Sequence, residues 1–126
     1  MKRLNKFFSA VLCTMVLMGL STSAYAKTIL YVPQDDRPVD YAYTVKIAED
    51  AGYTVLTPPR QYLSGSNFHG SPDELMNWVE THASEADAMV LSVDSLVYGG
   101  LVDSRKHNLD MNTIMNRLKN VESLHG

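Results

Sequence analysis

Three short apolar runs separate the polar parts of the chain. They lie at residues 28–32, 53–57 and 87–93, and each is rich in β-branched, aromatic or aliphatic side chains. The first is followed by Pro33 and the second by Pro58. Runs of this length and composition predict buried strands. Because the runs are continuously apolar rather than alternating, we expect a parallel sheet that is covered on both faces.

The segments between and after these runs repeat apolar residues at helical spacing. The first helix is predicted at residues 39–51, before Gly52, a residue that suits a helix C-terminus. The second begins with Ser71 as its N-cap and Pro72 in its first turn. The third begins at Asp110 and carries an apolar stripe that we expect to be buried. The stripe consists of Met111, Ile114, Met115, Leu118 and Val121.

Strands and helices therefore alternate as β-α-β-α-β-α, which is typical of α/β folds with a parallel sheet. We expect the strand order 2-1-3 and helices on both faces, as in one half of a Rossmann-like or flavodoxin-like fold. This α/β domain is predicted at residues 27–126. Three such units make only half of a usual doubly wound sheet, so we expect the chain to be the N-terminal part of a longer protein.

The first 26 residues predict a secretory signal peptide rather than part of the fold. The basic residues Lys2, Arg3 and Lys6 precede an apolar stretch at residues 7–20. Small residues then fit the A-x-A cleavage pattern at residues 24–26. The apolar stretch is too short for a transmembrane anchor. We therefore expect export to the periplasm, the cell surface or the exterior, with no stable membrane anchor after cleavage.

Removal of this segment makes the chain more acidic. The whole chain has 11 Lys and Arg against 14 Asp and Glu, and the segment holds three of the basic residues and no acidic one. The mature chain then has a net charge of −6, which argues against nucleic acid and anionic membranes as partners. The single cysteine, Cys13, also leaves, so the mature chain has no disulfide, thiolate metal site or cysteine nucleophile.

Polar residues follow each predicted strand, at the sheet edge where parallel α/β folds bind ligands. Asp35 and Asp94 are the candidate catalytic acids or bases, because a carboxylate near the end of a buried strand is costly unless it is paired or used. Asp36 is a candidate substrate ligand; alternatively it caps the first helix and pairs with Arg37. The other candidate substrate-binding residues are Arg37, Arg60, Tyr98, Gly99, Gly100, Ser104 and Arg105.

The arginines could form a cluster that holds a carboxylate, phosphate or uronate group, with surface ion pairs as the alternative. The glycines would let a ligand approach the backbone or simply form a turn. Nucleotide-binding signatures and a G-x-S-x-G elbow are absent, and the four histidines lack metal-ligand spacing. We predict no metal site and leave the cofactor open. Only His69, in the glycine-rich loop at 60–71, is expected to reach the sheet edge.

The polar segments resemble those of one protein family. The sequences DDRP at 35–38, PPR at 58–60, YGGL at 98–101 and SR at 104–105 occur in the order and spacing found in bacterial proteins grouped as domain of unknown function 4127. Residues 29–39 as a whole resemble the opening of these proteins. Members are much longer, so the resemblance implies that this chain is their N-terminal portion. It implies no reaction, cofactor or catalytic residue.

Three functional interpretations remain open. In the first, the chain belongs to an exported hydrolase acting on a carbohydrate or cell-wall component, with Asp35 or Asp94 as general acid or base. In the second, it is a binding module that captures a small molecule or glycan without chemistry. In the third, it is a fragment without independent function that aggregates through its open sheet edge. The oligomeric state is left open.

The signal peptide leads to a first prediction. When the full chain is produced in a bacterial host, we expect the exported product to begin at Lys27, because the small residues before it suit the signal peptidase. Mass spectrometry of the intact product measures its N-terminus. As a control, Ala24→Arg with Ala26→Arg should leave the segment uncleaved. A cell-retained chain that still carries Met1 would contradict the prediction.

Overall fold

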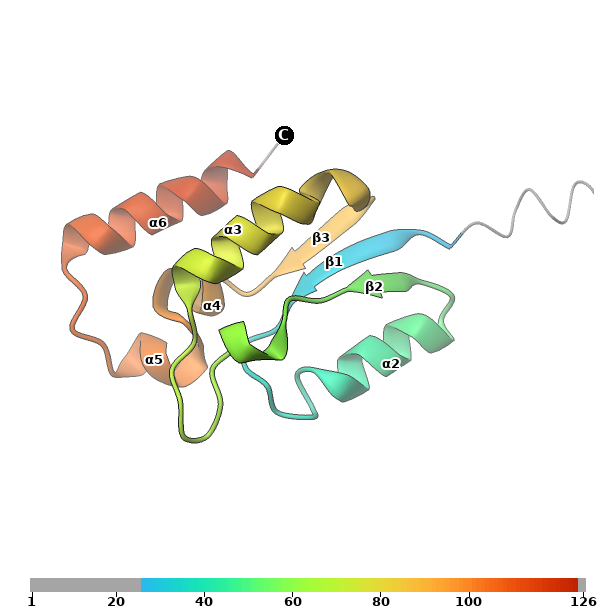
Figure 1. Cartoon of the computed structure of the whole chain (residues 1–126), viewed down its shortest axis with the longest axis horizontal. Coiled ribbons are helices and arrows are strands. Elements are labelled where there is room, and N and C mark those ends of the chain that lie inside the picture. The colour runs from blue at the N-terminus through green and yellow to red at the C-terminus, as the bar shows by residue number, and fades with distance from the viewer. Residues whose placement is uncertain (1–25, 125–126) are drawn as a thin grey trace, which may run out of the picture.

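A three-stranded parallel sheet forms the centre of the fold in the computed structural model, which describes residues 26–124 (Figure 1). The strands are β1 (Thr28–Val32), β2 (Thr54–Leu56) and β3 (Ala88–Leu91). Their order is β2-β1-β3, and Leu30 pairs with Leu56 on one side and Met89 on the other. The predicted α/β class and strand order are confirmed. The predicted signal peptide lies outside the described residues, apart from Ala26.

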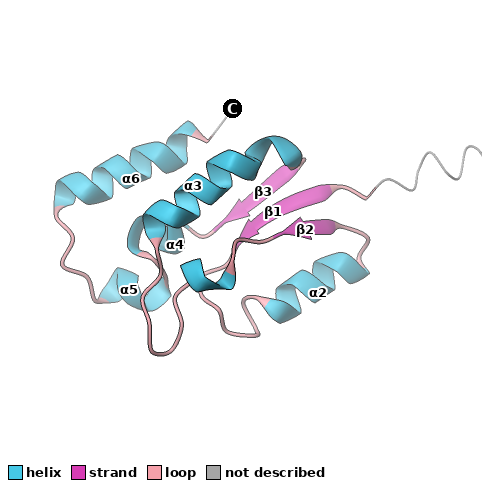
Figure 2. Cartoon of the chain, in the orientation of Figure 1, coloured by secondary structure: helices cyan, strands magenta, loops and turns pink. Residues whose placement is uncertain are grey.

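Helices lie on both faces of the sheet, as predicted (Figure 2). One face carries α2, and the other carries α3 and α6, while α4 and α5 follow β3 at the carboxyl edge of the sheet. Two single 3₁₀ turns, η1 (Arg60–Tyr62) and η2 (Ala83–Glu85), flank α3. None of the helices in residues 26–124 combines the length and the apolar character that crossing a membrane requires. The α-helices are α2 (Ala42–Asp50), α3 (Pro72–His82), α4 (Val93–Tyr98), α5 (Leu101–Arg105) and α6 (Met111–Ser123).

The core lies between β1 and α3. Leu30 and Val32 point from β1 toward Leu75 and Val79 of α3, and all four side chains are buried. Each buried aliphatic side chain of this kind stabilises the fold by about 1.5 to 3 kcal/mol relative to an exposed one. This packing holds the carboxyl end of β1 in place, and the residues that follow β1 start from a fixed point.

One face of β3 is not covered, which differs from the prediction of a sheet buried on both sides. Ala88 and Val90 point to this face, and Val90 is 55% exposed. The physical reason is the position of α2, which packs beside β2 and leaves β3 open on that side. The other two residues of the strand, Met89 and Leu91, pack against the core.

The third predicted strand is too long at its carboxyl end. It stops at Leu91, and Ser92 then caps α4 by accepting a hydrogen bond from the Ser95 N–H at 3.2 Å. Serine is one of the residues preferred at a helix N-cap. Asp94 therefore lies in the first turn of α4 and not at the end of a strand. A second short helix that was not predicted, α5, follows at Leu101–Arg105.

The ends of the other helices differ in detail. The first predicted helix begins at Ala42 rather than at residue 39, and Asp36 does not cap it, because the N-cap position is held by Tyr41. Ser71 and Pro72 occupy the predicted positions at the start of α3, but the Ser71 side chain makes no capping bond. The last helix starts where it was predicted, and Asp110 caps it by accepting a hydrogen bond from the Thr113 N–H at 2.9 Å.

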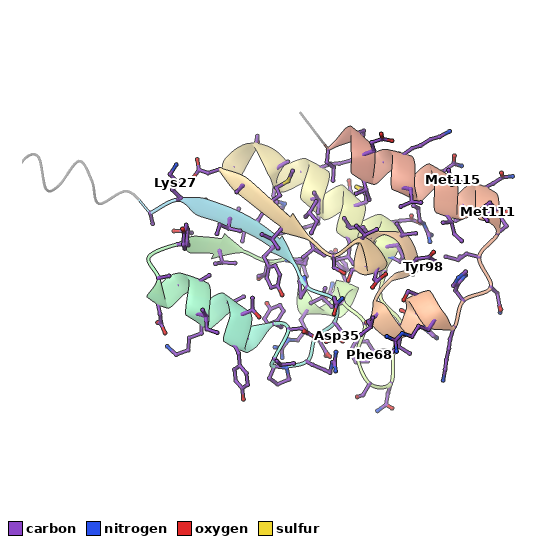
Figure 3. All side chains as sticks on the ribbon, turned by 180° about the vertical axis from the view of Figure 1, so that it is seen from behind. Lys27, Asp35, Phe68, Tyr98, Met111 and Met115 are labelled. Atoms are coloured by element: carbon purple, nitrogen blue, oxygen red, sulfur yellow. The ribbon has the colours of Figure 1, made fainter. Side chains whose placement is uncertain are left out.

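The apolar stripe of α6 is only partly buried. Ile114 and Val121 are half-buried, whereas Met111, Met115 and Leu118 are exposed, Met111 by 69%. Figure 3 labels Met111 and Met115 on this helix. The predicted burial of these three residues is wrong, because α6 packs along α4 through a narrow strip of its surface.

Close backbone contacts at glycines hold the loops at the carboxyl edge together. A Cβ atom at Gly70 would lie 1.8 Å from the Gly99 carbonyl oxygen, and one at Gly100 would lie 2.0 Å from the Ser64 Oγ. Gly99 ends α4 in the left-handed conformation, with φ at 106°. These glycines thus let the loop that begins at Ser64 pack against the start of α5. The close approach predicted at Gly99 and Gly100 is made by the chain itself.

Replacement of Gly70 by alanine tests this packing. We expect Gly70→Ala to lower the free energy of unfolding by about 1 to 3 kcal/mol or more, because the clash is with backbone atoms that cannot move alone. The matched control is Gly65→Ala, whose Cβ would lie closest to the ring of Phe68, a half-exposed side chain that can turn away. Urea unfolding of both variants measures the difference. Equal stability of the two variants would contradict the expectation.

Candidate functional site

The turn after β1 is organised by the carboxylate of Asp35, which is 7% exposed and lies just beyond the strand (Figure 3). Its Oδ1 accepts a hydrogen bond from the Arg37 N–H at 3.0 Å, and its Oδ2 accepts one from the Arg37 Nε–H at 2.9 Å. The Nη2 of Arg37 also donates to the Asp40 Oδ2 at 2.9 Å. Asp35, rather than Asp36, therefore pairs with Arg37.

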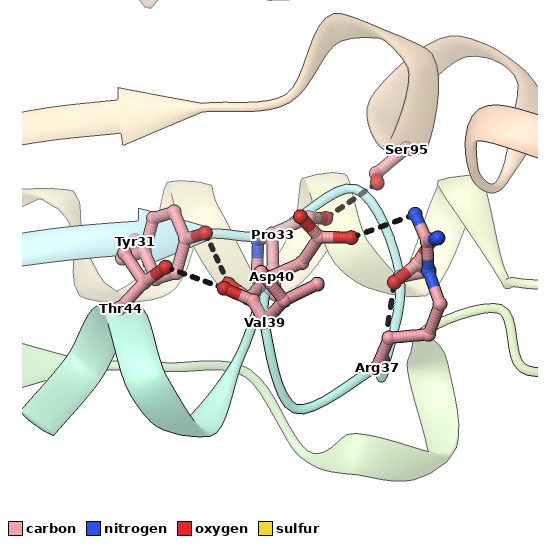
Figure 4. A network of polar contacts seen from close by, with 8 residues as sticks. Tyr31, Pro33, Arg37, Val39, Asp40, Thr44 and Ser95 are labelled. Carbon is pink, nitrogen blue, oxygen red and sulfur yellow. Dashed lines mark hydrogen bonds and ion pairs between the residues drawn. The ribbon is translucent and has the colours of Figure 1, made fainter.

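Two further bonds fix this turn against its surroundings (Figure 4). The Ser95 hydroxyl of α4 donates to the Pro33 carbonyl at 2.6 Å. The Tyr31 hydroxyl donates to the Asp40 carbonyl. Burial raises the pKa of Tyr31 above its usual value, so this phenol keeps its proton and stays a donor.

The two carboxylates beside Arg37 have opposite pKa shifts. For Asp35, burial is the largest single influence and opposes ionisation, but the hydrogen bonds and charge of Arg37 together outweigh it and lower the pKa. For Asp40, burial and the charge of neighbouring Asp35 raise the pKa. Asp35 is therefore ionised at neutral pH and has both oxygens engaged, which suits a structural carboxylate better than a general acid.

A cleft of about 310 Å³ opens beside this turn. We call it the DDRP cleft. Arg37 and Arg105 both line it, so the structure brings together two of the three arginines that were predicted to cluster. Asp36 and Ser66 add polar groups, and Val102 adds an apolar one. The complete lining consists of Asp35, Asp36, Arg37, Ser64, Gly65, Ser66, Leu101, Val102 and Arg105.

The other predicted site residues lie elsewhere. Arg60 does not line the DDRP cleft; its guanidinium lies over the Tyr41 ring at 4.8 Å. Asp94 lines a separate cavity of about 360 Å³, together with residues at the carboxyl ends of β1 and β3. Ser104 points back into its own helix and donates to the Leu101 carbonyl at 2.6 Å. Tyr98 contacts the ring of His107, with centroids 4.7 Å apart.

One polar pair was missed by the sequence interpretation. Asp103 is only 7% exposed, and its Oδ1 lies 2.5 Å from the Nδ1 of His69. Its Oδ2 accepts a hydrogen bond from the Gly70 N–H at 3.1 Å. His69 was predicted to reach the sheet edge, but the partner on α5 lies 34 residues away along the chain. No local spacing rule connects two residues so far apart.

A metal site is not evident among residues 26–124. No three side chains of the acidic, histidine or cysteine type come together there in a way that could hold an ion. Arg37 instead neutralises Asp35 and Asp40.

The Asp35–Arg37 pair leads to a prediction for stability and pH. We expect Asp35→Asn to lower the free energy of unfolding at neutral pH by about 1 to 3 kcal/mol, the usual contribution of hydrogen bonds to a charged group. Because the pKa of Asp35 is lower in the folded state than the usual value of about 3.9, its contribution is complete above that pH and is lost as the pH falls through the folded value. The difference between the two proteins should therefore shrink in acid.

Urea unfolding at neutral and acidic pH measures this difference. The matched control is Asp50→Asn, since the Asp50 carboxylate also pairs with a cation, Lys46, but is 65% exposed. Exposed pairs of this kind contribute little, so the control should stay close to wild type at both pH values. A difference between Asp35→Asn and wild type that does not change with pH would count against the proposed role of the carboxylate.

Comparison with known proteins places the chain in a family. No curated protein and no solved structure matches it. Residues 29–126, which include the DDRP sequence at 35–38, the DDRP cleft and the His69–Asp103 pair, match the model of a family described as a protein of unknown function. The chain belongs to this family, DUF4127.

Proposed function

We propose that the chain is an exported domain that binds a small sugar acid, such as a uronate, in the DDRP cleft. The observation that carries this proposal is that Arg37 and Arg105 line the same cleft. Among residues 26–124, neither Arg105 nor Asp36 is engaged in an ion pair, so both have polar atoms available to a ligand. The proposal that the domain is exported rests on the predicted signal peptide.

The lining of the cleft suits the three kinds of surface on a sugar acid. A guanidinium binds a carboxylate through paired hydrogen bonds, which is the role we give to Arg105. The carboxylate of Asp36 and the hydroxyl of Ser66 can accept and exchange hydrogen bonds with sugar hydroxyls. Val102, which is exposed, offers an apolar surface to the C–H face of the ring. A cleft of about 310 Å³ lies within the usual range for small-molecule sites.

The geometry favours binding over hydrolysis by Asp35 and Asp94. A pair of carboxylates that act as acid and base must flank the same scissile bond. Asp35 has both oxygens bonded to Arg37, and Asp94 lines a different cavity. The net negative charge of the mature chain also agrees with a small ligand held by local cations rather than a large polyanion.

Titration with galacturonate tests the proposal. We expect amide NMR signals of the ¹⁵N-labelled mature chain to shift at residues 35–37, 64–66 and 101–105, because these segments line the cleft. Galactose, which lacks the carboxylate, should bind more weakly. Arg105→Gln should weaken galacturonate binding about tenfold or more, the equivalent of one charge-assisted hydrogen bond.

The control variant is Asp94→Asn, which changes a carboxylate in the neighbouring cavity and should leave galacturonate affinity unchanged. Retained affinity in Arg105→Gln, or equal shifts with galactose and galacturonate, would overturn the proposed sugar-acid site. Release of galacturonate from digalacturonate, which has the glycosidic bond that galacturonate lacks, by wild type but not by Asp94→Asn would instead support the hydrolase interpretation.

A further inference from the structure

His69 and Asp103 form a pair that the proposed binding function does not use. The two side chains come from the loop before α3 and from α5, and they line a cavity of about 340 Å³ that is distinct from the DDRP cleft. The carboxylate is buried, whereas 87% of the His69 side chain is exposed. A buried carboxylate thus holds one edge of an imidazole whose other edge faces solvent.

The hydrogen bond fixes which ring nitrogen of His69 carries the proton. Oδ1 of Asp103 lies 2.5 Å from Nδ1, and its other oxygen is occupied by the Gly70 N–H. A carboxylate at this position requires a proton on Nδ1. In the neutral ring, Nε2 then has a free lone pair and can accept a proton. This is the arrangement by which a carboxylate orients a histidine for general-base catalysis.

The same cavity contains groups that favour negative charge. Nδ1 of His107 accepts a hydrogen bond from the Leu109 N–H at 3.2 Å, so its Nε2 carries the proton and is a donor. Lys106 also lines the cavity, and within residues 26–124 its ammonium forms no ion pair. A neutral N–H donor and a cation near a base can stabilise an oxyanion.

From this geometry we propose that the cavity hydrolyses small carboxylic esters, with His69 as the general base and Asp103 as its positioning residue. Among residues 26–124 no hydroxyl is hydrogen-bonded to His69, so water is the nucleophile. Nε2 of His69 takes a proton from water as the water oxygen forms a bond to the ester carbonyl carbon. The carbonyl oxygen becomes an oxyanion facing His107 and Lys106.

The intermediate then collapses. The carbonyl re-forms, the bond between the carbon and the leaving oxygen breaks, and that oxygen takes the proton back from Nε2 of His69. The products are a carboxylic acid and an alcohol, and the histidine returns to its starting state. The step requires no oxidant, reductant or second substrate.

Hydrolysis of p-nitrophenyl acetate by the mature chain tests this proposal through release of coloured p-nitrophenolate. We expect His69→Gln to lower the rate about hundredfold or more, within the usual contribution of a general base. This variant should fold, because the side chain is mostly exposed. The matched control is His82→Gln on α3, since that ring bonds the Trp78 carbonyl and lies outside the cavity. It should keep the wild-type rate.

The role of Asp103 is tested separately from its role in folding. Asp103→Asn should lower kcat about tenfold or more with little change in KM, because the amide no longer enforces a proton on Nδ1 of His69. The ¹⁵N shifts of the His69 ring report this tautomer directly, and circular dichroism reports whether the variant is folded. Asp103→Glu should recover part of the rate.

Two results would overturn the proposal. One is an equal rate for wild type and His69→Gln, and the other is an equal loss in His69→Gln and His82→Gln, which would show catalysis by any exposed imidazole. A folded Asp103→Asn with an unchanged rate would overturn the positioning role of Asp103. None of these results bears on galacturonate binding, because that ligand is assigned to the other cavity.

Discussion

The ionised carboxylate of Asp35 is the constraint on which the carboxyl edge of the sheet depends. Asp35 follows the end of β1, which packing against the core holds in place. Its carboxylate turns the chain by accepting hydrogen bonds from both the backbone and the side chain of Arg37. Burial alone would favour the neutral acid. The cation of Arg37 reverses that preference, so charge and turn geometry support each other. Without this bond, only the ion pair with Asp40 would hold the Arg37 guanidinium beside the cleft.

A loop that begins at Ser64 connects the turn after β1 to the cavity that His69 and Asp103 line. At its start, the Asp36 N–H donates to the Ser64 carbonyl at 2.9 Å, and at its end, the Gly70 N–H donates to Asp103. The contact of Gly70 with Gly99 leaves no room for a side chain between loop and helix. The loop is thus attached at one end to the turn after β1 and at the other to α5. The loop contributes to both cavities, because Ser64, Gly65 and Ser66 line the DDRP cleft and His69 lines the second cavity.

The elements that could be predicted from the sequence are those whose signals are local. The three strands, Pro72 at the start of α3 and the start of α6 at Asp110 were predicted because each depends on a few neighbouring residues. The strand order is not local, and it was predicted by placing the segment after β1 between the other two polar segments at the sheet edge. The choice between Asp35 and Asp36 was not predictable, since adjacent side chains differ only in the direction the turn gives them. The two short helices after β3 were missed because the apolar run continues through Val93, and only Ser92 marks the change.

The candidate site shows the same division more sharply. The arginines at 37 and 105 were predicted to share one edge, because each follows a strand of a parallel sheet. The partner of His69 depends instead on where α5 places Asp103, and α5 itself was not predicted. Asp103 and Arg105 are two positions apart on one helix, so their side chains leave it in different directions. A single short helix therefore supplies a cation to one cavity and a buried carboxylate to the other, which ties the proposed sugar-acid site and the proposed ester site to the same five residues of backbone.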